Sequence, residues 1–585
     1  MTVVLLVFAG RLVQLQIING PEAAAEGQAN RMVRTVQPAE RGQIVTADGT
    51  VLATDAPRYE IQANPEVVGA TDDQGQLIGP GPAELAAQLT AAVGIDQAKL
   101  EQMLRADEKW VELVKHAPQR QWDQVYEVVA EYLKKGVDPG IYASKHYIRS
   151  YPAGTLAGNL VGYQFETTDQ AGVKQYTGLE EVLSERLAGT AGSTETEVGG
   201  KQQPIPGGKV VSDPAEPGCD VTLTTDSTLQ FESQRLIQAQ VEKSKARAGM
   251  VVVKDLQTGG LLVLADSDTP DPAKPSGKTE GYSNSRAFEN VFEPGSTGKV
   301  VTMAMLLEEG FATPASQYSV PYQTTLGGQT FHDSSGHGTL QLTLTGVLAK
   351  SSNVGTLLAA QDVPDDTRYE YLKRFGFGEP TGLELPAKQE GVGVVHKPGD
   401  PPDEYGAYWD GRTRNNVLFG QGVSVNAIQA TDVFATLGNG GVHVDSHLVK
   451  GWNCDGAGFE AAPPAATEQV VSAETAAQVV QMMEAVVDSG TGTSAQVAGY
   501  RTAGKTGTSE MWDGPKQIKV GSFVGLLPAE APRIAIGVFI IAPTSGGYYG
   551  AEVAGPVFEQ IAALAVDRLG VPPSTTQATQ LPQEW

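Results

Sequence analysis

The stretch Glu293-Pro-Gly-Ser-Thr-Gly-Lys299 is the most informative part of this chain of 585 residues. A proline and a glycine interrupt the chain there, and the apolar spacing that follows predicts a helix over residues 296–307. Ser296 would lie at the first turn, where unpaired backbone N–H groups and the positive end of the helix dipole are found. Lys299 would lie one turn further on the same face, within reach of the Ser296 hydroxyl.

This spacing suits nucleophilic catalysis by the serine. A serine hydroxyl is a poor nucleophile until a neighbouring base takes its proton. A lysine can act as that base only if burial or a nearby cation lowers its pKa. The apolar residues after Lys299 and a second lysine further along the chain would supply both conditions. Alone, a Ser-x-x-Lys motif occurs by chance about once in a chain of this length, and the simpler interpretation is a helix cap beside an exposed lysine.

Two more short motifs follow in order, Ser351-Ser-Asn353 and Lys505-Thr-Gly-Thr508. The first comes after residues 340–349, an apolar stretch with helical spacing. Ser351 could relay a proton there, and Asn353 could form a hydrogen bond with a substrate amide. Taken alone, this motif is typical of a helix cap or a loop.

The third motif has the features of an edge strand. Gly507 has no side chain, so a ligand backbone could approach closely and pair with the strand. Lys505, Thr506 and Thr508 could offer charge and hydroxyl groups to a carboxylate. A tetrahedral oxyanion would fit between the backbone N–H groups of Ser296 and Thr508. The three motifs in this order predict a serine that is acylated by an amide or β-lactam carbonyl.

The composition argues against nucleic-acid binding and against a metal site. The formal net charge of -26 argues against an electrostatic nucleic-acid binder. The length suggests more than one domain. Cys219 and Cys454 lie far apart and outside any zinc-ligand spacing, so no metal site is expected, and whether they are bonded stays open. His332 and His337 are the closest pair of interest among the histidines, and neither is expected to be catalytic.

The first part of the chain has a mixed pattern of predicted strands and helices. Residues 21–218 contain a predicted hairpin at Asp48-Gly49 and predicted helices over 82–93 and 121–134. Residues 203–218 are dense in proline and glycine, which predicts a linker.

The remainder has a compact α/β pattern. Over residues 219–570, strands lie near both sequence ends with helices between them, which predicts an antiparallel sheet formed by the two ends. Residues 571–585 are expected to be disordered.

The first residues form a short apolar run, Met1–Gly10, which Arg11 ends. A membrane span needs about 20 residues. No basic region precedes the run and no clear cleavage site follows it, so a signal peptide fits poorly. We expect residues 1–20 to be part of a single-pass membrane anchor whose true start lies upstream. The alternative is a short buried segment.

Together these features resemble the class B penicillin-binding proteins, the monofunctional peptidoglycan transpeptidases. The resemblance extends over nearly the whole chain. Motifs similar to those of the family's juxtamembrane, pedestal and transpeptidase regions are Arg11-Leu-Val-Gln-Leu-Gln16, Arg41-Gly-Gln-Ile-Val-Thr-Ala-Asp-Gly49, Arg149-Ser-Tyr-Pro-Ala-Gly154, Gly178-Leu-Glu180 and Gly420-Gln-Gly422.

The resemblance implies an α+β fold in which a penicillin-binding domain of the serine β-lactamase type, residues 219–570, follows an elongated pedestal of the dimerisation type. Ser296 would be the acylated nucleophile and Lys299 the general base. Ser351, Asn353 and Lys505 would complete the catalytic set. The substrate-binding residues would be Thr506, Gly507 and Thr508.

The implied reaction has two steps. Ser296 would attack the D-Ala-D-Ala amide of one stem peptide and release D-Ala, and an amine on a neighbouring stem would then take the acyl group. Penicillins would stall at the acyl stage, and no metal or organic cofactor is implied. The implied partners are peptidoglycan strands derived from lipid II, β-lactams, and divisome proteins such as a SEDS-type glycosyltransferase. Overall length favours a septal, FtsI-like role, with the catalytic domain outside the cytoplasm.

Two alternatives stay open. A β-lactamase or D,D-carboxypeptidase shares the motifs but passes the acyl group to water, which needs a positioned base. Glu390 and Glu404 lie in loop-like sequence without a recognisable deacylation motif. A non-catalytic β-lactam sensor or divisome scaffold would be expected to carry several membrane spans or a protease region.

Overall fold

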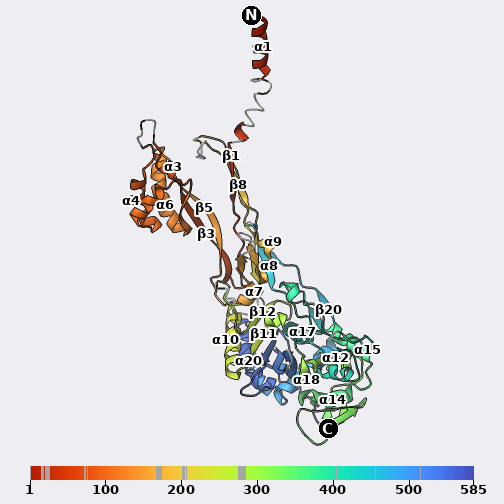
Figure 1. Cartoon of the computed structure of the whole chain (residues 1–585). Helices are drawn as coiled ribbons and strands as arrows, with labels where there is room; N and C mark the ends of the chain where they lie inside the picture. Colours follow the sequence, from red (N-terminus) through yellow and green to blue (C-terminus); the bar gives the residue numbers. More distant parts are fainter. Residues whose placement is uncertain are drawn as a thin grey trace.

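The computed structural model shows an elongated molecule with a short helix, α1 (Thr2–Val13), at one end and a large globular part at the other (Figure 1). Among the residues described, no helix is both long enough and apolar enough to cross a membrane. The structure describes residues 2–585 except for 15, 16, 18, 20–26, 30, 72, 73, 75, 76, 167–173, 200–204, 206, 275–284, 404, 405, 455, 514 and 515.

The globular part is built on an antiparallel sheet of five strands that combines both ends of its sequence, as predicted. In spatial order the strands are β12 (Leu261–Asp266), β11 (Ala248–Asp255), β23 (Ile534–Ile541), β22 (Lys516–Leu527) and β21 (Ala503–Asp513). Every residue of β23 is buried, because helices cover both faces of the sheet.

Two hydrophobic cores lie on opposite faces of this sheet. Met250 and Val252 on β11 face one core, whereas Val251 between them faces the other. This alternation is the one that a β-strand requires. One face carries α10 (Ser227–Ser244) and α20 (Gly555–Arg568). The other carries α12 (Lys299–Glu308), α17 (Ala427–Gly438) and α18 (Ala473–Asp488). The functional motifs lie on the second side.

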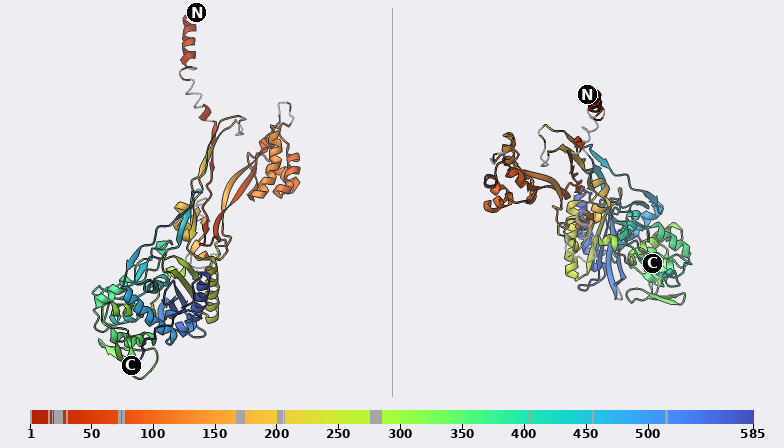
Figure 2. Two further views of the ribbon diagram at one scale, coloured as in Figure 1. Left: turned by 180° about the vertical axis from the view of Figure 1, so that it is seen from behind. Right: turned by 45° about the horizontal axis from the view of Figure 1, so that its top comes forward.

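The N-terminal part has a neck and a head, and the head projects to the side of the neck (Figure 2). The neck is a sheet of β1 (Met32–Gln37), β8 (Gly192–Glu197) and β9 (Val210–Asp213). The head has its own core and contains β3 (Val51–Ala63), β4 (Val111–Pro118), β5 (Ile141–Ser150), α3 (Pro65–Val68), α4 (Pro82–Val93), α5 (Gln97–Leu104) and α6 (Gln119–Lys134).

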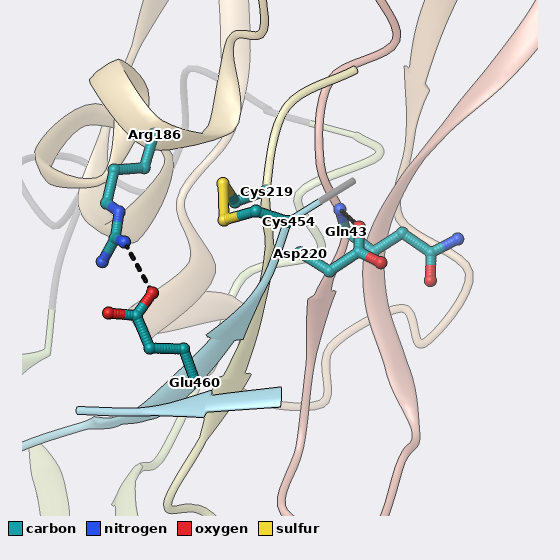
Figure 3. Close-up of a disulfide and its surroundings, with 6 residues drawn as sticks. All are labelled: Gln43, Arg186, Cys219, Asp220, Cys454 and Glu460. Carbon is teal, nitrogen blue, oxygen red and sulfur yellow. Dashed lines mark hydrogen bonds and ion pairs between the residues drawn. A yellow bond between two sulfur atoms is a disulfide. The ribbon is translucent and has the colours of Figure 1, made fainter. Parts of the chain in front are cut away.

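A sheet of seven strands joins the two parts, and it continues into β3, β4 and β5 of the head. Strand β10 (Asp220–Leu223) pairs in parallel with β2 (Ile44–Val45) and antiparallel with β18 (Val449–Asn453). Next to it, Cys219 and Cys454 form a disulfide with an S–S distance of 2.03 Å, which answers the question that the sequence left open (Figure 3). Two distant stretches of chain are therefore fixed covalently at the joint.

Hydrogen bonds and an ion pair surround this disulfide (Figure 3). The backbone N–H of Gln43 donates to Asp220 Oδ1 at 2.7 Å. On the other side, Arg186 Nη2 lies 3.4 Å from Glu460 Oε2. These contacts connect the start of β2 to β10, and the helix α9 (Ser184–Leu187) to β19 (Phe459–Ala461).

A buried network of ion pairs lies at the base of the pedestal. Arg41 Nε donates to Glu180 Oε2 at 2.7 Å, and Arg149 Nε donates to Glu180 Oε1 at 2.6 Å. Arg149 also pairs with Asp55 at 3.2 Å, and the Glu180 side chain is fully buried. The Glu180 carboxylate thus pairs with two guanidinium groups from separate motifs of the sequence, and Asp55 supplies the second negative charge.

Replacing Glu180 with alanine is expected to lower the free energy of unfolding by about 3–5 kcal/mol, because two buried arginines would lose their shared partner. Urea denaturation followed by circular dichroism measures this loss. The matched control is Glu181→Ala on the next, exposed residue, which should change stability by less than about 0.5 kcal/mol. Equal stability of the two variants would show that the network is not stabilising.

Three segments differ from the sequence-based expectations. The proposed linker 203–218 contains β9, because this strand pairs with β8. Residues 340–343 form the strand β16 (Leu340–Thr343) rather than the start of a helix, because they pair with β13 (Gln317–Val320).

The third difference concerns residues 571–585, which pack against the globular part instead of forming a disordered tail. Ser574 N donates to Gly499 O at 2.9 Å, and Thr343 N donates to Gln583 O at 3.0 Å. Leu581 packs against the larger core. The polar composition of this segment gave no sign of these tertiary contacts.

Candidate active site

Ser296 lies in a tight 3-10 turn, η2 (Gly295–Gly298), which continues directly into α12. Gly295 has a φ of +56° and its N–H donates to Gly420 O at 2.8 Å. A Cβ at Gly420 would lie 2.1 Å from the carbonyl oxygen of Gly295. The Gly-Gln-Gly signature therefore packs directly beneath the turn that carries the serine, and this close approach requires glycine.

The three motifs meet around two buried lysines. Lys299 Nζ donates to Ser296 Oγ at 3.2 Å and to the Ser351 carbonyl oxygen at 2.6 Å. Lys505 Nζ donates to Ser351 Oγ at 2.9 Å. A continuous chain of polar groups thus runs from Ser296 through Lys299 and Ser351 to Lys505.

Burial determines the charge state of these lysines. It lowers the pKa of Lys299 to about 7, and the nearby Asp333 carboxylate opposes this shift. Burial, together with the charge of Lys299, also holds the pKa of Lys505 well below its ordinary value. Near neutral pH, Lys299 is therefore able to accept a proton, as a general base must.

The second motif is held in a conformation that a serine rarely adopts. Ser351 has a φ of +59°, in the left-handed region, between α13 (Leu344–Ala349) and α14 (Asn353–Ala359). Such backbone conformations persist when the surrounding structure fixes them, and they cluster at functional sites. The bend directs the Ser351 hydroxyl and carbonyl toward the two lysines.

Asp333 stabilises the second motif through hydrogen bonds to its carboxylate. Its carboxylate accepts hydrogen bonds from Ser352 Oγ at 2.7 Å and from Val354 N at 3.0 Å. His337 Nε2 lies 3.0 Å from the same carboxylate. Asn353 Nδ2 donates to His332 O at 3.3 Å. The histidine pair thus borders the motif through Asp333 and the main chain.

The third motif lies on β21, which is the edge strand of the sheet, as predicted. Its glycine also has a packing role that the sequence did not predict. A Cβ at Gly507 would lie 2.2 Å from Ser522 Oγ and 2.9 Å from Thr297 Cγ2. Gly507 therefore lets the turn that carries Ser296 pack against the sheet, which places Ser296 next to Thr508.

A cavity of about 390 Å³ opens between the motifs. It is bordered by Ser296, Ser351, Asn353 and the stretch Thr506–Thr508, which brings six of the predicted site residues to one surface, while Lys299 and Lys505 lie buried behind it. Lining residues that the sequence prediction missed include Ser334, Lys350, Phe419, Gln421, Thr491, Tyr549 and Glu552.

Two of the missed residues had weak signals in the sequence. Thr491 stands in a short run of glycine and threonine, and its hydroxyl lies 2.8 Å from Thr506 Oγ1. Gln421 is the central residue of the Gly-Gln-Gly signature and lines the cavity. Asp333 had no sequence signal, because its role depends on a tertiary contact with the second motif.

The acidic residues considered for hydrolysis give that reaction no support. Glu390 Oε1 accepts hydrogen bonds at 2.6 Å from both the backbone N–H and the hydroxyl of Thr381. Glu404 lies outside the described residues. Within the described part of the chain, no cluster of residues suited to holding a metal ion is found.

This geometry suits acyl transfer by a serine whose proton a lysine could take. Family models agree: residues 249–563 match the penicillin binding protein transpeptidase domain, and residues 36–223 match the penicillin-binding protein dimerisation domain. The chain belongs to the penicillin-binding proteins, as an FtsI-like member of class B. Enzymes of this class are serine-type peptidoglycan D,D-transpeptidases of cell-wall synthesis.

Similarity to relatives extends over most of both chains. Penicillin-binding protein PbpB of Mycobacterium tuberculosis is 33% identical, over 97% of this chain and 84% of the relative. Peptidoglycan D,D-transpeptidase FtsI of Escherichia coli K12 is 29% identical, over 96% of this chain and 90% of the relative.

Solved structures show the same architecture. A peptidoglycan synthetase from Bifidobacterium adolescentis has a TM-score of 0.77 and 32% identity, over 95% of this chain and 100% of that one. Penicillin binding protein 3 of M. tuberculosis, complexed with aztreonam, has a TM-score of 0.68 and 29% identity, over 94% and 100%.

Proposed function

We propose that Ser296 is the residue that becomes acylated and that Lys299 takes its proton. The observation that carries this proposal is the 3.2 Å contact between Lys299 Nζ and Ser296 Oγ, made by a buried lysine whose pKa burial lowers to about 7. In the first step, Ser296 Oγ forms a bond to the penultimate D-Ala carbonyl carbon of a donor stem peptide. The C–N bond to the terminal D-Ala breaks, and its nitrogen gains a proton through Ser351 and Lys505.

In the second step an acceptor amine attacks the ester carbon. The new C–N bond forms the cross-link, the bond to Ser296 Oγ breaks, and the serine regains a proton. Thr506 and Thr508 would hold the donor carboxylate, and Asn353 would hold its amide. Backbone N–H groups of Ser296 and Thr508 would stabilise the tetrahedral oxyanion.

This assignment gives the two parts of the chain different roles. Residues 219–570 would perform acyl transfer, and residues 21–218 would serve as the pedestal. The separate core of the head and the buried ion pairs at the pedestal base support a stiff spacer.

The enzyme would act in septal wall synthesis, since FtsI-type and PbpB-type names recur among its relatives. A single-pass anchor including residues 1–20 would hold the catalytic part outside the cytoplasm, near a SEDS-type glycosyltransferase. The disulfide between Cys219 and Cys454 supports an oxidising compartment.

The test supplies the purified protein with uncross-linked peptidoglycan strands and follows products by mass spectrometry, alongside a benzylpenicillin time course. The expected result is release of D-Ala with formation of cross-linked dimers, and a long-lived penicillin adduct. Release of D-Ala without dimers would indicate a carboxypeptidase, and a rapidly lost adduct with hydrolysed drug would indicate a β-lactamase. Absence of any adduct would favour the scaffold alternative.

A further inference from the structure

The segment Leu581–Trp585 lies as an added strand beside β16 at the back of the active site. Leu342 and Glu584 form an antiparallel bridge. On either side of it, Thr343 N donates to Gln583 O at 3.0 Å and Trp585 N donates to Gln341 O at 3.3 Å. The main chain of this segment is thereby fixed to the strand that leads into α13.

This segment also contacts the start of α13 directly. The Thr343 side chain caps that helix by accepting a hydrogen bond from Gly346 N at 3.1 Å, and its hydroxyl donates to Pro582 O at 2.6 Å. A Cβ at Gly346 would lie only 1.9 Å from Gln583 O. The helix whose end carries Ser351 is therefore in close contact with the segment over its first turn.

The side chain of Gln583 reaches the loop that follows α18 and leads to the cavity-lining residue Thr491. Its Nε2 donates to Ser489 Oγ at 2.8 Å, two residues before Thr491. Thr491 N in turn donates to Ala349 O at 3.2 Å, and its hydroxyl meets that of Thr506 at 2.8 Å. One short segment thus connects the helix of the second motif with the loop that supports the third.

We propose that residues 581–585 are a positioning element for acyl transfer, with Gln583 as its central residue. The segment fixes α13 relative to the loop that follows α18. It thereby keeps Ser351 and Thr506 in the relative positions that their contacts with Lys299 and Lys505 require. This inference rests on the proposed function of Ser296 and Lys299. It assigns no contact between the segment and the substrate.

Lys350 adds a further link at the cavity wall. Its Nζ lies 3.4 Å from Glu584 Oε1, and both side chains are exposed. An exposed ion pair of this kind stabilises little. The hydrogen bonds of Gln583 and the packing on Gly346 therefore carry the positioning role.

The experiment compares the full chain with a variant lacking residues 581–585 and with Gln583→Ala. For each protein, the second-order rate of acylation by benzylpenicillin is measured by intact mass from pH 5.5 to 9, together with the melting temperature. We expect the deletion to slow acylation about ten- to a hundredfold, since misplacement of catalytic groups by about 1 Å has effects of this size. Water entering the loosened site should also move the midpoint of the pH profile upward.

Matched variants separate positioning from general stability. Gln583→Glu should restore the rate that Gln583→Ala loses, because the Ser489 hydroxyl can donate to the new carboxylate. Thr576→Ala removes another contact of the same region, the 2.8 Å bond from Arg501 Nη1, and should leave the rate unchanged. If the deleted protein does not fold, Gly346→Ala displaces the segment without shortening the chain.

An unchanged rate and pH midpoint in Gln583→Ala and in the deletion, or in Gly346→Ala where the deletion does not fold, would overturn the inference. So would a rate loss that only follows the fraction of unfolded protein. If the full chain itself forms no penicillin adduct, the proposed function fails instead, and the two failures are thus distinguishable.

Discussion

Replacing Ser296 with alanine is expected to abolish the penicillin adduct. In the proposed mechanism the hydroxyl oxygen forms the acyl bond, and Lys299, which contacts Ser296 Oγ and the Ser351 carbonyl oxygen, only moves protons. Loss of the serine nucleophile lowers turnover by about 10⁶-fold in a Ser-His-Asp protease. Intact-protein mass spectrometry after incubation with benzylpenicillin measures the result directly.

The control for this experiment is Ser334→Ala. Ser334 lines the same cavity but belongs to none of the three motifs, so its variant should form the adduct as the wild-type protein does. Both variants should retain the wild-type melting temperature, because the Ser296 side chain is only partly buried. An undiminished adduct on Ser296→Ala would show that another residue is the nucleophile.

Sequence patterns were sufficient where the chemistry is local. The Ser-x-x-Lys spacing placed Lys299 beside Ser296, and the edge-strand prediction for Lys505–Thr508 is confirmed. The hydrophobic runs near both ends of the globular part predicted the shared antiparallel sheet. In each case, a periodicity or a spacing of a few residues determines the structure.

Features that depend on contacts between distant residues could not be predicted in this way. Asp333 contacts the second motif only through tertiary hydrogen bonds from Ser352 Oγ and Val354 N. Gly507 was expected to make room for a ligand, and the sequence did not show that its missing side chain also makes room for Thr297 and Ser522. The order of residues 581–585 depends on a strand, β16, whose helical spacing of apolar residues misled the prediction.

Acylation by the wild-type enzyme is expected to rise with pH around a midpoint near 7. Burial lowers the pKa of Lys299 to about 7, so below this pH the ammonium form predominates and cannot take the Ser296 proton. The rate should fall about tenfold for each pH unit well below the midpoint and level off above it. A measurement of the benzylpenicillin acylation rate from pH 5.5 to 9 gives this profile.

Substituting Lys299 with methionine should lower the plateau rate by about 10²–10⁴-fold, the usual contribution of a general base, and should remove the midpoint near 7. The variant keeps an apolar chain of similar length in a fully buried position, so folding is expected to be retained. In this variant Lys505 would lose a neighbouring positive charge. Its pKa should therefore rise, because the charge of Lys299 helps to lower the pKa of Lys505 in the wild type.

Lys450→Met, at an exposed position on β18, controls for the loss of one lysine. A Lys299→Met profile that keeps both its rate and its midpoint would assign the base to another residue, with Lys505 as the next candidate through its 2.9 Å contact with Ser351 Oγ.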